Sequence, residues 1–423
     1  MEFKGFDNYV RNNPYSDRFD VIRFHSLEFW CNDAVNTARR FGWALGMNEI
    51  AHSNLATNNP HFASSVMNCN NVSFVFTAPY NNNDNDNNKD TCPLPNYNQD
   101  QAFEFIKKHG VAVRAVCITV SDAELAYNKC VEGTPDCGVL KPTKLVSKES
   151  KSNSMTISEV KLVGDVVIRW ISGDSSTAAT NNIPLYLPFY EAKESIEQSI
   201  GITRVDHCVS NVPKLADIIQ PHLKAMTGFH EFAEFTAEDV GTVDSGLNSV
   251  VMASNNEAVL LPFNEPTFGT KRQSQIQTYL VHNNGAGIQH IALKTNDIFR
   301  TIREMRTRGN IGGFEFMPAP NPVYYSRIPD RIGKDTLTAD QLVELQKLGI
   351  LADKDDQGVL LQIFTKPVGD RPTLFIEIIQ RIGCDKDEKG QETEQRAACG
   401  GFGKGNFSEL FKSIEEYEKQ LNI

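Results

Sequence analysis

The chain has 423 residues, 40% of them hydrophobic, which is enough to form two domains with apolar cores. Its 42 Lys and Arg residues against 53 Asp and Glu residues give a formal net charge of −11, which argues against nucleic acid or an anionic membrane surface as a partner. No segment approaches the ~20 apolar residues of a membrane-spanning helix, and the first residues have neither the apolar core of a signal peptide nor the composition of a transit peptide.

Segments with helical periodicity alternate with longer strand-like stretches along the chain. The very polar, Asn-rich segment 81–88 and the polar segment 148–154 predict solvated loops. Residues 183–200, which contain two prolines, predict a connection between two domains, 1–190 and 200–423. The apolar spacing predicts helices over residues 32–45, 122–130, 212–227, 297–308, 339–348 and 407–421.

The nine cysteines are scattered and include no Cys-x-x-Cys pair. This usage predicts a reduced, cytosolic-type compartment, with no disulfide framework and no zinc site built from paired cysteines. We therefore expect a cytoplasmic protein and leave a plastid location open.

An internal repeat divides the chain into two halves. The same number of residues separates His25 from Gly46 and His207 from Gly228, and both intervals read as a strand, an amphipathic helix and a glycine. The repeat therefore predicts that strand-rich modules with one main helix each recur along the chain.

Two further pairs of segments extend the repeat. Residues 110–122 align with 285–297, and residues 164–169 align more loosely with 369–377. Each half is therefore expected to contain two modules.

Three metal-competent side chains occupy aligned strand positions in the second half. They are His207, His290 and Glu377, where the first half holds His25, Ala115 and Arg169. Because alanine cannot bind a metal and a guanidinium repels one, the repeat predicts a metal site in the C-terminal half alone. The N-terminal half is then a scaffold or a shield for the cleft.

Two histidines and one carboxylate form the facial triad of non-haem Fe(II) oxygenases, which leaves positions open for substrate and O₂. Glu377 lies in an apolar strand-like run, where a buried carboxylate needs a cation, either a metal ion or an ion pair with Arg371 or Arg381. Taken singly, His207 and His290 are each more often explained as hydrogen-bonded core histidines than as metal ligands. The ligand types alone do not separate Fe(II) from Zn²⁺ or Mn²⁺.

Two other patterns suggest a ligand cavity. Gln362 and Phe364 share one face of a strand, which suits an aromatic ligand with polar substituents, and the alternative is a strand with one solvated glutamine. The glycine-rich stretch 400–405 lacks the Gly-Lys-Ser/Thr ending of a phosphate loop, so it predicts a hinge. The helix 407–421 would then be a lid with Phe407 over the site, or would simply dock on the core.

Several sequence blocks resemble the 4-hydroxyphenylpyruvate dioxygenase family in its plant form. They are residues 245–249, 271–279, 355–358 with 361–367, 371–372 with 375–381, and 400–410, within a resemblance over about residues 18–421. The resemblance implies an α+β fold of the vicinal-oxygen-chelate, or glyoxalase-like, type, with two domains of paired βαβββ modules. It also implies an open C-terminal β-barrel that encloses the metal, and a C-terminal lid helix.

The same resemblance implies Fe(II) as the only cofactor. It implies 4-hydroxyphenylpyruvate and O₂ as substrates, and homogentisate and CO₂ as products. It further implies a homodimer that acts in tyrosine and phenylalanine catabolism, or in precursor supply for plastoquinone and tocopherol.

Carried over position by position, the resemblance assigns the iron ligands to His207, His290 and Glu377. It assigns substrate contacts to Ser249, Asn264, Gln275, Gln289, Gln362, Phe364, Phe375, Phe402, Asn406 and Phe407, and catalytic roles to Asn264, Gln275 and Gln289. Phe364 and Phe407 would sandwich an aromatic ring, and the polar groups would hold the phenol. Gln289 needs a strand end or a bulge, because simple alternation points it away from His290.

Two rival functions share these features. 4-Hydroxymandelate synthase resembles the same fold, substrate and triad but hydroxylates the benzylic carbon, so identification of the product separates the two. A non-catalytic binding protein built on the same modules is the second rival. The intact triad argues against it, and the iron content of Glu377→Ala tests the point.

Overall fold

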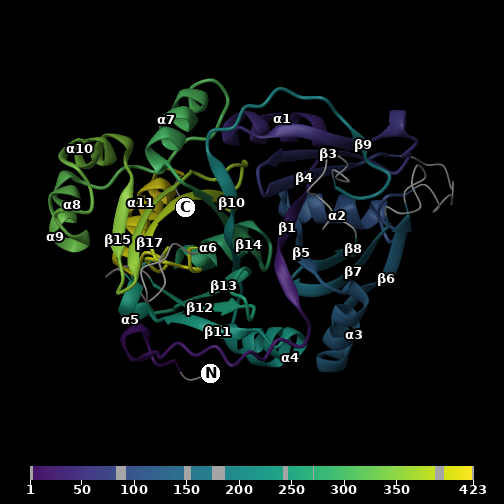
Figure 1. Cartoon of the computed structure of the whole chain (residues 1–423), viewed down its shortest axis with the longest axis horizontal. Helices are drawn as coiled ribbons and strands as arrows, with labels where there is room; N and C mark the ends of the chain where they lie inside the picture. Colours follow the sequence, from purple (N-terminus) through teal and green to yellow (C-terminus); the bar gives the residue numbers. More distant parts are fainter. Residues whose placement is uncertain are drawn as a thin grey trace.

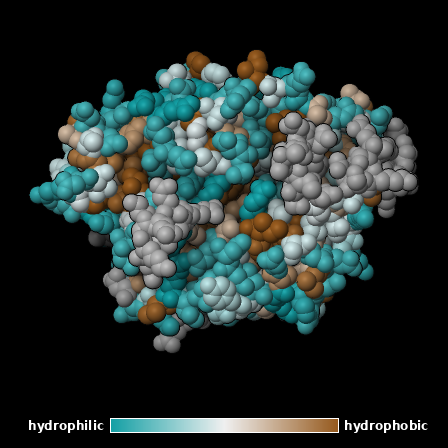
Figure 2. Space-filling model, in the orientation of Figure 1, coloured by the Kyte–Doolittle hydropathy of each residue, from teal (hydrophilic) through white to brown (hydrophobic). Residues whose placement is uncertain are grey.

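The computed structural model describes residues 3–81, 92–146, 154–173, 186–241, 246–269, 271–385 and 395–421. Within them, two curved β-sheets stand side by side with helices packed around them (Figure 1). Most of the Asn-rich segment 81–88 and of the polar segment 148–154 lies outside the described residues. No described helix has both the length and the apolar character needed to cross a membrane. Figure 2 shows a mostly hydrophilic face with small hydrophobic patches.

The first sheet has nine strands in the order β6-β7-β8-β5-β1-β4-β3-β2-β9. Its strands are β1 Val21–Trp30, β2 Asn48–Ser53, β3 Phe62–Cys69, β4 Val72–Pro79, β5 Ala112–Val120, β6 Gly138–Val146, β7 Ser154–Val163, β8 Val166–Gly173 and β9 Glu191–Ala192. β9 lies in the segment expected to connect domains. That segment also buries Tyr186 and Leu187 in the first half, because both side chains are large and apolar.

The second sheet has eight strands in the order β11-β12-β13-β10-β14-β17-β16-β15. Its strands are β10 Ile202–Asn211, β11 His230–Phe235, β12 Leu247–Ala253, β13 Leu260–Pro266, β14 Gly287–Thr295, β15 Leu351–Lys354, β16 Gly358–Phe364 and β17 Phe375–Gly383. In each sheet two central antiparallel strands are flanked by parallel partners. The two strand orders therefore correspond one to one from β1/β10 to β8/β17, and the predicted fold of paired βαβββ modules is confirmed.

The hydrogen-bond register corrects one pair in the predicted repeat. His207 lies opposite Ala292 in β10–β14, and Ser26 lies opposite Cys117 at the same place in β1–β5. Ser26, and not His25, therefore corresponds to His207. The reason is a β-bulge in both strands, which leaves His25 and Asp206 as the extra, unpaired residues.

The same registers agree with the other two predicted pairs. Arg169 lies opposite Cys117 in β5–β8, and Glu377 lies opposite Ala292 in β14–β17. Ala115 and His290 stand two residues before these partners. Their alignment in the sequence is therefore also an alignment in space.

Helices cover the sheets and close the ends of the modules. They are α1 Ala34–Leu45, α2 Gln99–His109, α3 Ala123–Gly133, α4 Ala225–Thr227, α5 Ala237–Val240, α6 Gln275–His282, α7 Ile298–Gly309, α8 Pro322–Ser326, α9 Ile328–Ile332, α10 Ala339–Leu348 and α11 Phe407–Leu421. The shorter turns are η1 Phe6–Asn8, η2 Leu55–Thr57, η4 Pro135–Cys137, η6 Leu215–Asp217, η7 Ile219–Lys224 and η8 Lys404–Asn406.

Local signals explain where several helices begin. Asp122 and Asp297 cap α3 and α7 at equivalent places, since each carboxylate accepts a backbone N–H from the first turn. Thr338 and Gln341 form a capping box on α10. α2 and α6, which the apolar spacing did not reveal, also start at side-chain caps.

The helix expected over residues 212–227 is wrong as one element. The segment divides into η6, the π-type turn η7 and the short α4. Pro221 lies inside it and has no N–H to donate, which interrupts the regular hydrogen bonding of an α-helix. The predicted glycine stop after it stands, because Gly228 has a φ of 80° and a Cβ there would come within 2.1 Å of Ser16 O.

One apolar core cluster continues through both halves. Phe41 on α1 meets Phe314 from the second half with ring centroids 4.9 Å apart. The N-terminal segment crosses to the second half, where Lys4 N–H and Gly5 N–H donate to Glu234, and runs along β11 and α4 (Figure 1). The two halves are therefore tied by packing and by this N-terminal strap, residues 3–18.

The scattered cysteines predicted no disulfide framework, but one disulfide is present. Cys384, just past β17, and Cys399 are joined by a disulfide, while the other seven cysteines are free and buried. The two lie 15 residues apart. Only the return of the chain to the end of β17 brings them together, which the spacing alone does not reveal.

Candidate metal centre

The predicted triad comes from three neighbouring strands at the centre of the second sheet. β10 carries His207, β14 carries His290 and β17 carries Glu377. Ala292 on the middle strand pairs with both His207 and Glu377, and its small side chain leaves room between them. Alternation along β14 then sets His290 on the same face, two residues away.

The donor atoms of the triad converge. His207 Nε2 and His290 Nε2 lie 3.2 and 3.4 Å from Glu377 Oε2, and the three side chains offer ligand atoms within 4.8 Å of one another. His207 and Glu377 are buried, and the His290 side chain is 12% exposed. The described residues thus hold a compact set of two nitrogens and one carboxylate.

The hydrogen bonds on the far side of each imidazole test whether this set fits a metal. His207 Nδ1 donates to Asp206 Oδ1 at 2.9 Å, and His290 Nδ1 donates to Gln289 Oε1 at 3.0 Å. In the neutral imidazoles, each Nε2 lone pair then points at the Glu377 carboxylate. Two lone pairs facing an anion repel it unless a cation lies between them, so the donor set fits a divalent metal ion.

Without a metal ion, the same Nε2 atoms can carry protons and donate to Glu377, and that arrangement sets the pKa values of the triad. Burial would raise the pKa of Glu377, but the bonds to His207 and His290 outweigh burial and lower this pKa to about 2. Burial, together with the nearby charge of His207, lowers the pKa of His290 despite the opposing effect of Glu377. For His207 burial is opposed and exceeded by the bonds to Asp206 and Glu377, which raise its pKa.

An ion pair supports the imidazole of His207 from behind. Arg381 donates to both oxygens of Asp206, at 2.9 and 2.7 Å, and both side chains are buried. Burial would raise the pKa of Asp206, but the Arg381 guanidinium holds it well below its usual range. The alternative in which Arg371 or Arg381 neutralises Glu377 is therefore wrong, because Arg381 binds Asp206 and Arg371 binds backbone carbonyls.

A chain of amides connects Glu377 to the C-terminal segment. Gln362 Nε2 donates to Glu377 Oε1 at 3.2 Å, and Asn406 Nδ2 donates to Gln362 Oε1 at 3.3 Å. Tyr324 Oη donates to Asn406 Oδ1 at 2.7 Å. The amide of Gln362 thus occupies one carboxylate oxygen and leaves the other facing the histidines.

A cavity with an empty volume of about 470 Å³ opens over the triad. Six of the residues assigned to the substrate line it: Asn264, Gln362, Phe364, Phe402, Asn406 and Phe407. Five more lining residues were not singled out in the sequence: Val209, Phe235, Val251, Pro262 and Leu410. Alternation could have found three of them, since Val209, Val251 and Pro262 each stand two residues from a site residue on the same strand.

The other assigned residues lie beside this cavity. Gln275, Gln289 and Phe375 line a neighbouring pocket of about 340 Å³ beneath α11. Ser249 pairs with Asn264 across β12–β13. The bulge that Gln289 needed is present, because Val209 pairs with His290 and Ser210 with Ile288, which leaves Gln289 as the extra residue.

A His/His/Glu donor set inside the second of two sheets of paired βαβββ modules defines a metal-dependent enzyme of the vicinal-oxygen-chelate type. None of the protein-family models compared with the chain matches it. The similarity to individual proteins is extensive. The 4-hydroxyphenylpyruvate dioxygenases of Plectranthus scutellarioides and Arabidopsis thaliana are 55% and 53% identical to the chain, over 99% of it and over 94% and 92% of their own lengths. The chain belongs to the 4-hydroxyphenylpyruvate dioxygenase family.

Solved structures agree on the fold. A triple mutant of 4-hydroxymandelate synthase from Streptomyces coelicolor superimposes with a TM-score of 0.74 at 18% identity, over 94% of this chain and 99% of that one. A fusion of a xylose isomerase-like TIM barrel with a 4-hydroxyphenylpyruvate dioxygenase gives a TM-score of 0.63 at 17% identity, over 96% of this chain and 54% of that one. At these identities the likeness concerns the fold alone.

Proposed function

We propose that the chain catalyses the reaction 4-hydroxyphenylpyruvate + O₂ → homogentisate + CO₂, with Fe(II) held by His207, His290 and Glu377. The observation that carries the proposal is the combination of 51–55% identity to plant 4-hydroxyphenylpyruvate dioxygenases with the convergent, buried triad. Tyrosine catabolism, in which homogentisate is an intermediate, is the role that follows.

Bound Fe(II) would supply a Lewis-acidic centre with adjacent open positions for a 2-oxo acid and for O₂. The chain's contribution is to hold the three ligands and to orient them. Asp206 and Gln289 fix the two imidazoles through their Nδ1 atoms. Gln362 holds the carboxylate of Glu377 through Oε1, so that Oε2 faces the metal position.

The walls of the cavity fit an aromatic 2-oxo acid. Phe364 and Phe407 both line the cavity, and we assign them the two faces of the substrate ring. Val209, Val251 and Pro262 add apolar surface that excludes water from the reacting atoms.

Polar groups gather at one side of the cavity. Asn264 Nδ2 lies 3.2 Å from Asn211 Oδ1 and 3.5 Å from Gln289 Oε1, and the last contact is long enough to give way to a ligand. We assign Asn264, Gln275 and Gln289 to the phenol and to the oxygen that develops on the ring, and Ser249 to the same group. Phe375, Phe402 and Asn406 complete the assigned contacts.

Product identification tests the reaction. The full chain, loaded anaerobically with Fe(II), is mixed with 4-hydroxyphenylpyruvate and O₂, and the products are separated and identified by mass and NMR. We expect homogentisate and CO₂ in equal amounts. 4-Hydroxymandelate, which has the same composition as homogentisate, would assign the synthase activity instead, and the absence of turnover with iron bound would reject both activities.

Anomalous scattering at the iron edge tests the ligands separately. We expect one peak within bonding distance of His207 Nε2, His290 Nε2 and a Glu377 oxygen. A peak elsewhere would reject the assignment of the site whatever the product is.

We also propose that the chain acts as a homodimer in the cytoplasm, and that residues 1–190 and 200–423 are its two domains. The support is the family resemblance and the two separate sheets. Light scattering during size-exclusion chromatography tests the dimer, and a mass equal to one chain would reject it.

A further inference from the structure

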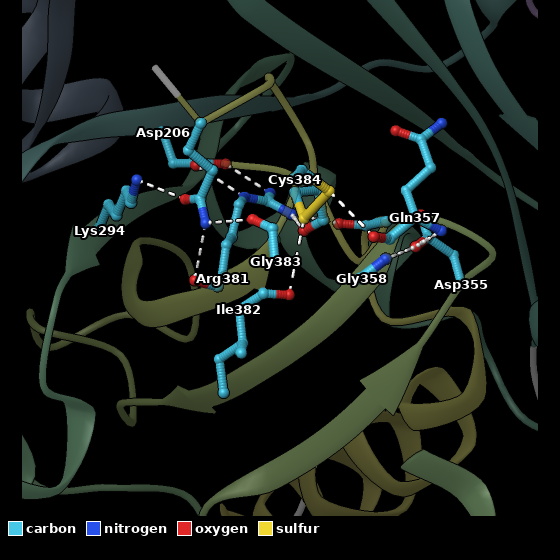
Figure 3. The surroundings of a disulfide bond; sticks show 12 residues. Asp206, Lys294, Asp355, Gln357, Gly358, Arg381, Ile382, Gly383 and Cys384 are labelled. Atoms are coloured by element: carbon cyan, nitrogen blue, oxygen red, sulfur yellow. Dashed lines mark hydrogen bonds and ion pairs between the residues drawn. A yellow bond between two sulfur atoms is a disulfide. The ribbon is translucent and has the colours of Figure 1, made fainter. Parts of the chain in front are cut away.

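The Cys384–Cys399 disulfide joins the two segments that shape the metal centre (Figure 3). Cys384 follows directly on β17, the strand that carries Glu377. Cys399 begins the glycine-rich cover, residues 399–406, which leads to α11 and includes the cavity-lining Phe402 and Asn406. The cross-link thus fixes the start of the cover to the strand of a metal ligand.

A buried series of hydrogen bonds runs from the cross-link to His207. The carbonyl of Cys399 accepts from Arg381 Nη1 at 2.7 Å, and so does the carbonyl of Gly401. Arg381 holds both oxygens of Asp206, and Asp206 accepts from His207 Nδ1 (Figure 3 shows the Arg381 and Asp206 side chains beside the disulfide). A shift of the backbone at Cys399 therefore moves two acceptors of the guanidinium that positions the Asp206–His207 pair.

The backbone around the cross-link needs support from outside itself. Cys384 has a φ of 59° and Ala398 a φ of 50°, both in the left-handed region that side chains disfavour. Gly400 fits so closely that a Cβ there would come within 2.6 Å of Val359 C. The disulfide supplies a covalent restraint at the point where the chain adopts these conformations.

The far end of the cover is held without a covalent bond. Gly405 N–H donates to Asp353 Oδ2 at 2.7 Å, and Asn406 donates to Gln362. Phe402 packs on the His207 ring with centroids 5.3 Å apart. Opening of the disulfide would therefore leave hydrogen bonds and packing to hold the segment that covers the metal.

The pair differs from the other cysteines in its exposure to reagents. The seven free thiols are buried, and burial raises the pKa of Cys92, Cys117 and Cys137 to about 11, so little reactive thiolate is present. Cys384 is half-buried, whereas Cys399 is fully buried. Of the two, Cys384 is the residue with surface open to solvent, so a thiolate would attack there.

We propose that Cys384 and Cys399 form a redox-active modification site, in which the disulfide holds the glycine-rich cover and the Arg381–Asp206–His207 series in place, and reduction by a dithiol loosens both. This inference rests on the proposed function only in naming iron as the metal.

The exchange balances in two steps. A thiolate of the dithiol attacks Cys384 Sγ, the bond to Cys399 breaks, and Cys399 leaves as a thiolate that takes up a proton. The second thiol of the dithiol then attacks the mixed disulfide and releases Cys384. Two electrons pass from the dithiol to the protein pair, and the dithiol becomes a disulfide.

Thiol mapping tests whether the pair exchanges in the folded protein. The full, iron-loaded chain is equilibrated with mixtures of reduced and oxidised dithiothreitol, alkylated without denaturation, and analysed by mass spectrometry. We expect Cys384 to gain the label as the mixture becomes reducing, and both residues to gain it after subsequent denaturation. A pair that stays disulfide-bonded under every reducing mixture, or dithiol under every oxidising mixture, overturns the proposal.

Iron release tests the coupling without any measurement of turnover. The chain is reduced with dithiothreitol, desalted, and mixed with a coloured Fe(II) chelator, with the oxidised chain in parallel. We expect release about 3- to 10-fold faster from the reduced chain, below the ~10–100-fold effect of removing an outer partner of a metal ligand. Equal rates would mean that the disulfide is a structural staple only.

Two variants keep the result specific. The double variant Cys384→Ser/Cys399→Ser should release iron at the rate of the reduced chain and should not respond to dithiothreitol. Cys137→Ala, at a buried free thiol in the first half, should keep the full response. A product other than homogentisate would reject the proposed function and leave the redox proposal intact. Homogentisate formation with iron release that does not depend on the disulfide would support the proposed function and reject the redox proposal.

Discussion

The central strands of the two sheets have the same register, but their charges are arranged with opposite signs. In the second sheet the positions hold His207, His290 and Glu377, an anion with two nitrogen lone pairs turned toward it. In the first sheet the matching positions hold Ser26, Ala115 and Arg169. The first half thus carries the positive charge of the Arg169 guanidinium at the place where the second half can bind a metal cation.

The surroundings of Arg169 complete this inversion. Arg169 pairs with Glu28 at 2.6 Å and with Glu159 at 2.7 Å, and all three side chains are buried. By register, Glu28 stands where the cavity-lining Val209 stands, and Glu159 where Phe364 stands. One backbone therefore supports either a closed ion network or an open metal cavity, and a few side chains decide between them.

The largest effect should come from removing the anion of the second half. We expect Glu377→Ala to weaken iron binding by more than about a hundredfold, since even outer partners of ligands account for ~10–100-fold, and to abolish turnover. Iron content after gel filtration and homogentisate formation are the measurements. The control is Ser26→Ala, at the position that matches His207, and it should retain iron and turnover. Normal iron content in Glu377→Ala would contradict the assignment of Glu377 as a metal ligand.

Removing the cation of the first half should affect stability and leave the metal in place. Arg169→Met leaves two buried carboxylates unpaired, which we expect to cost about 3–5 kcal/mol of unfolding free energy. Chemical denaturation of the full chain measures the loss, and iron content should not change.

The triple variant Glu28→Val/Arg169→Met/Glu159→Phe sharpens this test. It places the apolar residues of the second half at two of the matching positions and leaves no charge unpaired. We expect it to be more stable than Arg169→Met alone. If the triple variant were as unstable as Arg169→Met, packing rather than charge would determine the stability of the first half.

A smaller effect should separate the two bulge residues. Asp206→Asn removes the charge that holds His207 Nδ1 and Arg381, so we expect iron affinity to fall by about 10–100-fold. His25→Asn changes the matching bulge residue of the first half and should leave iron affinity unchanged. Competition with a chelator measures both, and equal affinities would show that Asp206 does not position the ligand.

The smallest effect concerns the strap, which belongs to the first half in sequence and to the second in space. Burial raises the pKa of Asp17 to about 6, although Asn255 N–H donates to its carboxylate. A raised carboxyl pKa means that the folded state binds this proton more tightly than the unfolded state. The contribution of Asp17 to stability is therefore largest below about pH 4 and falls as pH rises through about 6.

Because Asp17 is partly exposed, we expect only about 1 kcal/mol from this group. Asp17→Asn keeps an acceptor for Asn255 and should remove this pH dependence. Urea denaturation at pH 5 and pH 7 measures it, and an unchanged difference between the two pH values would assign the effect to other groups.

Much of the site followed from the pattern of residues. The repeat grouped His207, His290 and Glu377, each of them weak evidence for a metal site by itself, into one predicted triad. Alternation placed Gln362 and Phe364 on one face of a strand. The family resemblance added the polar residues assigned to the substrate. The β-bulge that Gln289 requires is present in the structure. The structure brings the three donor side chains together and sets Gln362 and Phe364 in one cavity, because strand alternation and repeat alignment survive in any correct fold of the modules.

Other features depended on contacts between residues that are far apart in the chain. The Asp206–Arg381 pair joins residues 175 positions apart, and no local pattern links them. The bulges made Ser26 the counterpart of His207, because an extra residue shifts which side chain faces the cavity. Pro221 also broke a helix that the apolar spacing supported.

The sequence by itself determined the module repeat and predicted the His/His/Glu donor set in the second half, because both depend on residue identity and period. The tertiary structure alone decided which charges meet. It paired Arg381 with Asp206 rather than with Glu377, closed Cys384 on Cys399, and divided the assigned contacts between two pockets. The physical reason is that ion pairs, disulfides and cavities depend on distances of a few ångströms between residues far apart in the chain, which only packing sets.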